Sequence, residues 1–213
     1  MRKAVEKIVE LPPRRVEQTD IPIIGETPYI SHAWSHKART QMLDKQMGKA
    51  RAKKPPKDPW IDFCESLYWM SDKPENPTQE DIDSAQFGIP AIAFKAAAVS
   101  ACRLVSGIPM TLARISFHIL GPLVEIKGKP EMHEAFVRNE TGVADIRYRA
   151  IFNEWSAILR VYYDPTTISL DNVVTLIDRG GFGPGVGDNR PERGGENGRY
   201  RVQETGWGHK REL

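Results

Sequence analysis

The chain has 213 residues, of which 40% are hydrophobic and 27% charged, and its formal net charge is +2 at pH 7. These values describe a globular chain long enough to bury a core as one elaborated domain spanning residues 1–213. No apolar stretch approaches the roughly 20 residues of a spanning helix, and the N-terminus lacks the apolar core of a secretory signal. We therefore expect a cytoplasmic protein in which Cys64 and Cys102 are reduced core residues.

The chain opens with two short segments of different character. Residues 1–15 form a charged, helix-capable arm that ends at Pro12 and Pro13. Residues 16–30 then predict a strand with a break at Gly25, and Pro22 suggests an edge position or an irregularity in it.

A long excursion follows over residues 31–86, and its first half is strongly basic. Asp44 is the one acidic residue among eight basic residues between positions 37 and 57, which gives a local charge of +7 and leaves −5 for the rest of the chain. The basic residues are Lys37, Arg39, Lys45, Lys49, Arg51, Lys53, Lys54 and Lys57. Segregated positive charge is the footprint expected of a partner with many phosphates. A basic helix face kept in solution by its charge is the alternative.

The second half of the excursion contains the aromatic stretch WIDFCESLYWM, residues 60–70, with apolar positions at helical spacing. A helix of this kind belongs to a core more often than it forms a base-stacking platform. We therefore interpret residues 31–86 as an inserted lobe with basic and aromatic helices.

Residues 87–105, FGIPAIAFKAAAVSACRLV, predict an alanine-rich helix that begins after a proline and lies close against a sheet. Lys95 and Arg103 interrupt its apolar surface. Lys95 either extends its stem to solvent or reaches an anion.

Alternation around TLARISFHI predicts a strand over residues 111–126, with a helical start as the alternative. His118 lies on its polar face and is interpreted as structural, because no carboxylate or nucleophile is evidently coupled to it. Residues 146–152 and 155–163 predict a hairpin that turns at Asn153 and Glu154. Arg147 and Arg149 share one face of its first strand and could follow a nucleic-acid backbone.

Ser169 is a good N-cap for a helix that Gly180 and Gly181 would end. Residues 180–202 then contain eight glycines, with Arg190, Arg193, Arg199 and Arg201 among them. Glycine lets backbone N–H groups approach a ligand closely, and arginine offers a planar fork suited to phosphate. The segment is either a polyanion-binding loop or a solvated flexible connection, and residues 198–204 predict a last strand.

The order strand, helix, strands, helix, glycine loop, strand predicts an α+β fold with a ferredoxin-like split βαβ core. The large insertion lies between its first strand and first helix. The same layout builds the RNA-recognition fold, in which a sheet face contacts single-stranded nucleic acid.

Two segments resemble the repeat-associated mysterious protein (RAMP) superfamily of CRISPR systems. IPAIAFKAAAVSACR, ending at Arg103, is similar to that family's first-helix region, and GPGVGDNRPERGGENGRYRV, ending at Val202, is similar to its C-terminal glycine-rich loop. The backbone subunits that polymerise along a guide RNA are the most similar members, and the resemblance implies non-catalytic, sequence-independent binding of a single strand. The chain departs from the pattern because it is compact and lacks a clear second ferredoxin-like half. It also resembles phage-encoded proteins.

The leading hypothesis is therefore a non-enzymatic protein of a bacterial host cell that assembles head-to-tail along single-stranded RNA or DNA. The hypothesis requires the glycine loop to lie beside the alanine-rich helix, with cations lining the crevice between them. The residues expected to bind the strand are Lys95, Arg103, Arg147, Arg149, Arg190, Arg193, Arg199, Lys37, Arg39 and Lys45.

Two alternatives belong to other classes of protein. One is a metal-independent endoribonuclease that uses His32 and His36, four residues apart, as general acid or base. The other is a structural or interaction subunit whose basic segment faces an acidic protein. The glycine loop lacks the ending of a P-loop and does not lie between a strand and a helix. Asp145 and Asp188 have no evident partners and no cluster has metal-ligand spacing, so we expect no cofactor and no metal.

Overall fold

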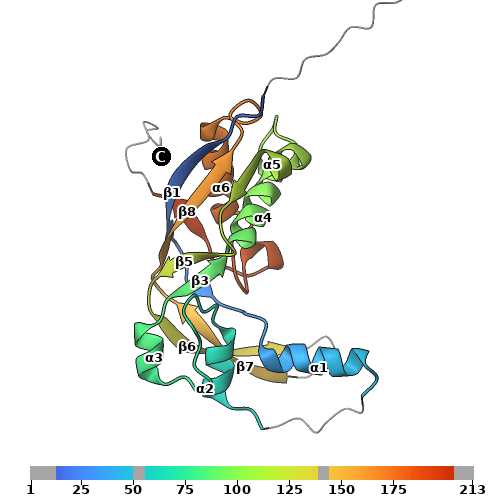
Figure 1. Ribbon diagram of the computed structural model, residues 1–213, viewed down its shortest axis with the longest axis vertical. Coiled ribbons are helices and arrows are strands. Elements are labelled where there is room, and N and C mark those ends of the chain that lie inside the picture. The colour runs from blue at the N-terminus through green and yellow to red at the C-terminus, as the bar shows by residue number, and fades with distance from the viewer. Residues whose placement is uncertain (1–12, 50–55, 139–143, 204–213) are drawn as a thin grey trace, which may run out of the picture.

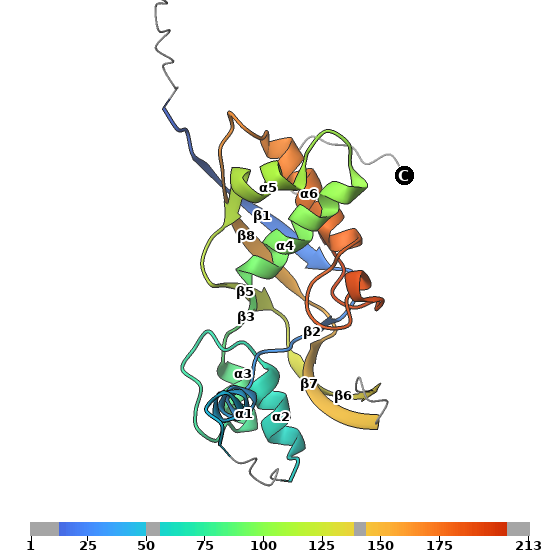
Figure 2. The same ribbon diagram turned by 90° about the vertical axis from the view of Figure 1, so that its right-hand side faces the viewer.

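The computed structural model describes residues 13–49, 56–138 and 144–203, and within them the protein is a mixed α+β structure with antiparallel sheets and six α-helices. One part consists of the larger sheet with helices on one of its faces, and the other consists of a three-stranded sheet with three helices (Figures 1 and 2). No helix in the described ranges is long and apolar enough to cross a membrane.

The elements have the following bounds. The strands are β1 (Glu17–Gly25), β2 (Tyr29–Ile30), β3 (Phe87–Pro90), β4 (Phe117–Ile119), β5 (Leu123–Lys127), β6 (Pro130–Arg138), β7 (Ala144–Phe152), β8 (Ser156–Tyr163) and β9 (Tyr200–Val202). The helices are α1 (His36–Gln46), α2 (Pro59–Ser66), α3 (Gln79–Ser84), α4 (Ala91–Ala101), α5 (Met110–Ser116) and α6 (Leu170–Phe182), with short 3₁₀ turns η1 (Cys102–Leu104) and η2 (Pro191–Arg193).

The larger sheet has the strand order β3–β5–β8–β1–β9, and β4 pairs with β8 beyond the end of β5. The predicted first strand and its break at Gly25 are confirmed, because β1 ends there and β2 begins at Tyr29. Pro22 lies within β1 although the strand is central. Its carbonyl accepts from Gln203 N–H at 2.9 Å, and Gln203 follows the last residue of β9. The missing N–H of Pro22 therefore costs at most one hydrogen bond, at the end of the ladder between β1 and β9.

The core lies between the larger sheet and helices α4 and α6, which pack against each other on one sheet face (Figure 2). Alternate residues of β8, such as Leu159 and Val161, are buried there, while Ile158 and Arg160 point to the open face. The alanine-rich helix is confirmed as α4, and Ala97 and Ala98 let α6 approach it closely.

The second part of the molecule contains α1, α2, α3 and the sheet β2–β7–β6 (Figure 1). Asp58 caps α2 by accepting from the N–H groups of Trp60 and Ile61, which explains where the aromatic helix begins. Phe63 and Cys64 are buried in the core, so the interpretation of this helix as core is confirmed. Cys102 is also buried, and both cysteines are free thiols.

The predicted hairpin of residues 146–163 is wrong. The two strands exist, as β7 and β8, but they belong to different sheets: β7 pairs with β6 and β2, whereas β8 pairs with β1, β4 and β5. The chain crosses between the sheets at Trp155, whose carbonyl accepts from Gly25 N–H at 2.8 Å and whose indole donates to the Thr27 carbonyl at 2.9 Å. The chain also passes from the larger sheet to the smaller one between β1 and β2, and this connection lies beside the one between β7 and β8.

The strand predicted from Thr111 is also wrong over its first half, where the alternative of a helical start is correct. Residues 110–116 form α5 after Pro109 at its N-cap, and the strand β4 begins only at Phe117. Ala113 and Ser116 are buried at a spacing of three, while Ile115 is 73% exposed, so the buried face follows the helical period.

Helix α6 begins as predicted, with the Ser169 side chain accepting from Asn172 N–H. It does not stop at the two glycines but continues to Phe182. A Cβ at Gly180 would crowd the backbone of Ala98, and one at Gly181 would overlap the carbonyl of Tyr200. These glycines therefore serve close packing of the helix against α4 and β9 rather than its termination.

Candidate nucleic-acid interface

The glycine loop and α4 lie side by side, as the leading hypothesis requires. Between them is a hollow of about 280 Å³ that extends to the segment between β2 and α1. Its lining residues are Tyr29, His32, Tyr68, Ile89, Pro90, Ala93, Ala96, Ala97, Gly185, Val186, Gly187, Asp188, Arg190 and Glu192. We call it the loop hollow.

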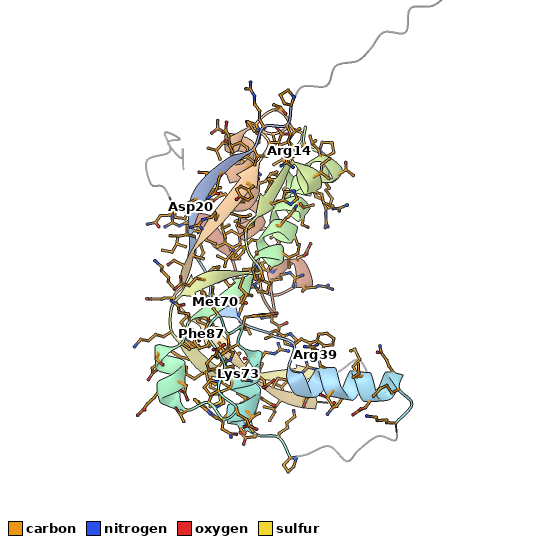
Figure 3. The ribbon with its side chains drawn as sticks, in the orientation of Figure 1. Arg14, Asp20, Arg39, Met70, Lys73 and Phe87 are labelled. Atoms are coloured by element: carbon orange, nitrogen blue, oxygen red, sulfur yellow. The ribbon has the colours of Figure 1, made fainter. Side chains whose placement is uncertain are left out.

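A second hollow has a volume of about 210 Å³. It lies between α2 and β7 and is lined by His32, Ala33, Ser35, Asp62, Glu65, Ser66, Arg147, Tyr148 and Arg149. His32 lines both hollows, and we call the two together the junction groove. Helix α1 projects from the body beside this groove, with Arg39 near its beginning (Figure 3).

The backbone of the glycine loop is largely satisfied by its own hydrogen bonds. Val186 N–H donates to the Gly198 carbonyl at 2.9 Å, and Gly198 N–H donates to the Pro28 carbonyl at 2.8 Å. The amides of Gly185, Asp188, Glu192, Arg193, Gly194, Gly195 and Asn197 likewise donate to backbone carbonyls. The loop is thus folded on itself, and these amides are not directed at a ligand.

The junction groove is not purely cationic, because four carboxylates line it beside three arginines. Asp188, which the sequence left without a partner, forms an ion pair with the buried side chain of Arg149. Glu192 accepts from Ser100 Oγ at 2.6 Å and lies 3.4 Å from both Arg103 and Arg190. These contacts lower the pKa of Glu192, with the Ser100 hydrogen bond the largest cause. These two carboxylates therefore partly neutralise the charges of Arg103, Arg149 and Arg190.

Arg147 and Arg149 line the second hollow together with His32. Tyr68 lies beside it and donates from its hydroxyl to the His32 carbonyl at 3.0 Å. Burial, followed by the positive charges of Arg149 and Arg147, lowers the pKa of His32. Burial lowers the pKa of Arg149 to about 10, which still leaves it charged at neutral pH. His32 is therefore an uncharged imidazole among cations.

Lys95 lies away from the groove. Its Nζ is 2.9 Å from Nδ1 of His118 and 5.8 Å from the centre of the Phe117 ring, at the edge of the larger sheet where β4 runs. Burial lowers the pKa of Lys95. The structure thus couples His118 to a lysine, which the sequence pattern could not indicate because 23 residues separate the two.

The remaining predicted cations are dispersed. Arg193 is exposed on η2, and Arg199 lies 3.5 Å from Glu26 and 5.3 Å from the centre of the Phe182 ring, outside both hollows. Arg39 and Lys45 are exposed on α1. The side chains of Lys37 and His36 fall outside the described part, as do residues 1–12, Arg51, Lys53 and Lys54.

The structure corrects two further expectations, on His32 and on Asp145. His32 precedes α1, so it does not share a helical face with His36. Asp145 is also not isolated, since it forms ion pairs with Lys57 and, at 3.3 Å, with Arg147. The Lys57 hydrogen bond is the largest of the causes that lower the pKa of Asp145.

The two described histidines with lowered pKa values predict a dependence of stability on pH. A histidine that holds fewer protons folded than unfolded makes the protein less stable as pH falls below about 6.5. We expect the imidazole signals of His32 and His118 to titrate below that value in an NMR pH titration. Lys95→Met should raise the midpoint of His118, whose pKa is lowered by burial and then by Lys95, and leave His32 unchanged. A midpoint for His32 above that of free histidine would contradict the lowered pKa described above.

No group of three or more His, Cys, Asp or Glu side chains that could hold a metal ion occurs among residues 13–49, 56–138 and 144–203. No protein-family model and no curated protein matches the sequence.

Proposed function

We propose that the protein binds single-stranded nucleic acid without enzymatic turnover, with its phosphates on the exposed cations beside the junction groove. The observation that carries the proposal is α1. Apart from Asp44, every side chain described in it is exposed, and Arg39 and Lys45 lie among them, with Lys49 just beyond its end. A helix of 11 residues whose described side chains, at positions 39–46, form no buried face is marginal in water. A bound polyanion would supply the stabilisation that packing does not.

The topology supports a finer description of the fold under the same proposal. The segments β1, α4, β4, β8, α6 and β9 follow one another along the chain, and the corresponding strand order is β9–β1–β8–β4 with both helices on one face. This is the order of a ferredoxin-like split βαβ unit. The lobe of residues 31–86 enters after the first strand, as in the resemblance to RAMP proteins. The open sheet face carries Tyr162 but no second aromatic side chain among the described residues, which favours the groove over that face.

Assembly belongs to the proposal as well. Head-to-tail contact of copies along one strand would place successive α1 helices beside successive stretches of backbone. Besides its cations, α1 exposes Met42 and Leu43, and Met47 follows directly after it, each about half accessible. Such a surface suits contact with either a neighbouring copy or the strand.

The proposal predicts a specific loss of salt dependence. Arg39→Gln with Lys45→Gln should weaken binding of a labelled 20-nucleotide strand about tenfold and reduce the slope of log affinity against log salt by about 1.4, since each phosphate contact with a single strand contributes roughly 0.7. Fluorescence anisotropy between 50 and 200 mM NaCl measures both. The matched control is Lys127→Gln with Lys129→Gln, which removes the same charge from exposed positions at the end of β5 and in the turn after it. Equal losses in both variants, or no binding by the unaltered protein, would refute the proposal.

A second candidate, a metal-independent endoribonuclease, is favoured by the position of His32. An imidazole with a lowered pKa is unprotonated at neutral pH and can accept the proton of a ribose 2′-hydroxyl as its oxygen attacks the adjacent phosphorus. The bond from phosphorus to the 5′-oxygen of the next nucleotide then breaks, which leaves a 2′,3′-cyclic phosphate and a 5′-hydroxyl whose proton comes from water. Arg147 and Arg149 line the same hollow as His32. If this candidate is right, the protein cleaves RNA but not DNA in the presence of EDTA. His32→Ala should then reduce the rate at least a hundredfold, while His133→Ala on β6 leaves it unchanged. RNA that remains intact after long incubation would refute this candidate.

A further inference from the structure

The loop hollow differs in chemistry from the cationic surface beside it. Its apolar lining comes from β3 and α4, with Ile89, Pro90, Ala93 and Ala97, and from the ring of Tyr29 on β2. Its charged groups, Asp188, Arg190 and Glu192, come from the glycine loop. Two further rings, those of His32 and Tyr68, complete the lining. The lining thus combines apolar surface with at least as much polar surface, and a few convergent polar groups beside apolar ones are found in small-molecule sites.

This hollow is poorly suited to a phosphate. Asp188 and Glu192 would repel one, and both hold arginines that would otherwise attract it. The amides of Gly185, Val186 and Asp188 donate to carbonyls of the protein, so they offer no anion cradle. Any ligand that enters must be largely apolar on its faces and must carry both donors and acceptors at its edge.

A nucleobase has this combination. Its planar faces can lie on the alanines of α4 and against the Tyr68 ring, which the hydrogen bond to the His32 carbonyl holds in place. The amino groups at its edge can donate hydrogen bonds to a carboxylate. The ring nitrogens and carbonyl oxygens at its edge can accept hydrogen bonds from a guanidinium. The volume, about 280 Å³, lies at the lower end of small-molecule sites. We propose that the loop hollow binds one nucleobase, either of a bound strand or of a free nucleotide.

In the case of a strand the inference rests on the proposed function and refines it. Phosphates would stay outside, near exposed cations such as Arg103 and Arg193, while one base turns into the hollow. In this arrangement Asp188 and Glu192 would accept hydrogen bonds from the amino groups of the base. Binding would depend on the presence of a base, not on charge alone.

The test compares ligands that differ only in the base. Adenosine and guanosine monophosphates are titrated into the full chain against ribose 5-phosphate, and the methyl NMR signals of Ala93 and Ala97 report occupancy of the hollow. In parallel, anisotropy compares a 20-nucleotide strand with one in which every base is absent. We expect the monophosphates, but not the sugar phosphate, to shift both methyl signals. We also expect the base-free strand to bind about tenfold more weakly.

Three variants connect the result to the hollow. Ala93→Leu fills the hollow and should abolish the preference for bases, whereas Ile92→Leu, exposed one position earlier on α4, should preserve it. Tyr68→Ala should weaken base binding about tenfold, whereas Tyr68→Phe, which keeps the ring but loses the hydrogen bond to the His32 carbonyl, should weaken it less. If strands with and without bases bind equally, nucleic-acid binding stands and the base site is refuted. If strands do not bind but a monophosphate does, the base site stands and the proposed function is refuted. If neither a strand nor a monophosphate moves the two methyl signals, the inference fails.

Discussion

Replacing Gly198 with alanine is expected to lower the free energy of unfolding by about 4 kcal/mol, at the upper end of single substitutions. Its φ of 71° lies in the left-handed region, and an added Cβ would overlap the carbonyl oxygen of Val186. The backbone cannot shift to relieve this contact, because Gly198 N–H is bound to Pro28 and its carbonyl to Val186 N–H. A backbone shift at Gly198 would break two hydrogen bonds. One joins Gly198 to Val186 within the loop, and the other joins Gly198 to Pro28 between β1 and β2.

Gly194 provides the matched control. Its φ of 82° is also left-handed, but an added Cβ would meet no atom within 4 Å. Gly194→Ala should therefore cost only the conformational penalty, about 1 kcal/mol. Urea unfolding followed by circular dichroism gives both values. Similar costs for the two variants would mean that the loop is a flexible connection, in contrast to the hydrogen-bonded structure described above.

Arg149→Ala is expected to cost about 3 kcal/mol of stability, the typical penalty for breaking a buried ion pair. The Arg149 side chain is 7% exposed and joins β7 of the three-stranded sheet to Asp188 of the glycine loop. Its removal leaves that carboxylate, itself about one-third exposed, without its partner. The same variant should raise the pKa of His32, because the charge of Arg149 is the second cause of its lowering after burial.

Arg147→Ala separates the effect of burial from that of charge. Arg147 lies two residues away on the same strand, and its side chain is 41% exposed and 3.3 Å from Asp145. Its removal should cost less than about 1 kcal/mol, as for other surface ion pairs. A double-mutant cycle of Arg149→Ala with Asp188→Ala measures the coupling directly. A coupling near zero would show that the two parts of the molecule are not joined through this pair.

Local chemistry was enough to predict several elements. Ser169 caps α6 and Pro90 precedes α4, because capping and proline geometry act within a few residues. The burial of Phe63 and Cys64 followed from helical spacing. In the region of α5, apolar residues at alternate positions favour a strand. Pro109, at the N-cap of α5, is the local signal that favours the helix.

The sequence by itself therefore determined the helices with clear caps, the central strands with an alternating buried face, the reduced core cysteines and a segment of concentrated positive charge. Only the tertiary structure decided that β7 leaves β8 for a second sheet, that the paired glycines of α6 serve packing, and that Asp188 and Glu192 neutralise arginines of the groove. The reason is that strand pairing, close backbone approach and ion pairing join residues far apart in the chain. Arg149 and Asp188 are 39 positions apart, and no local pattern relates them.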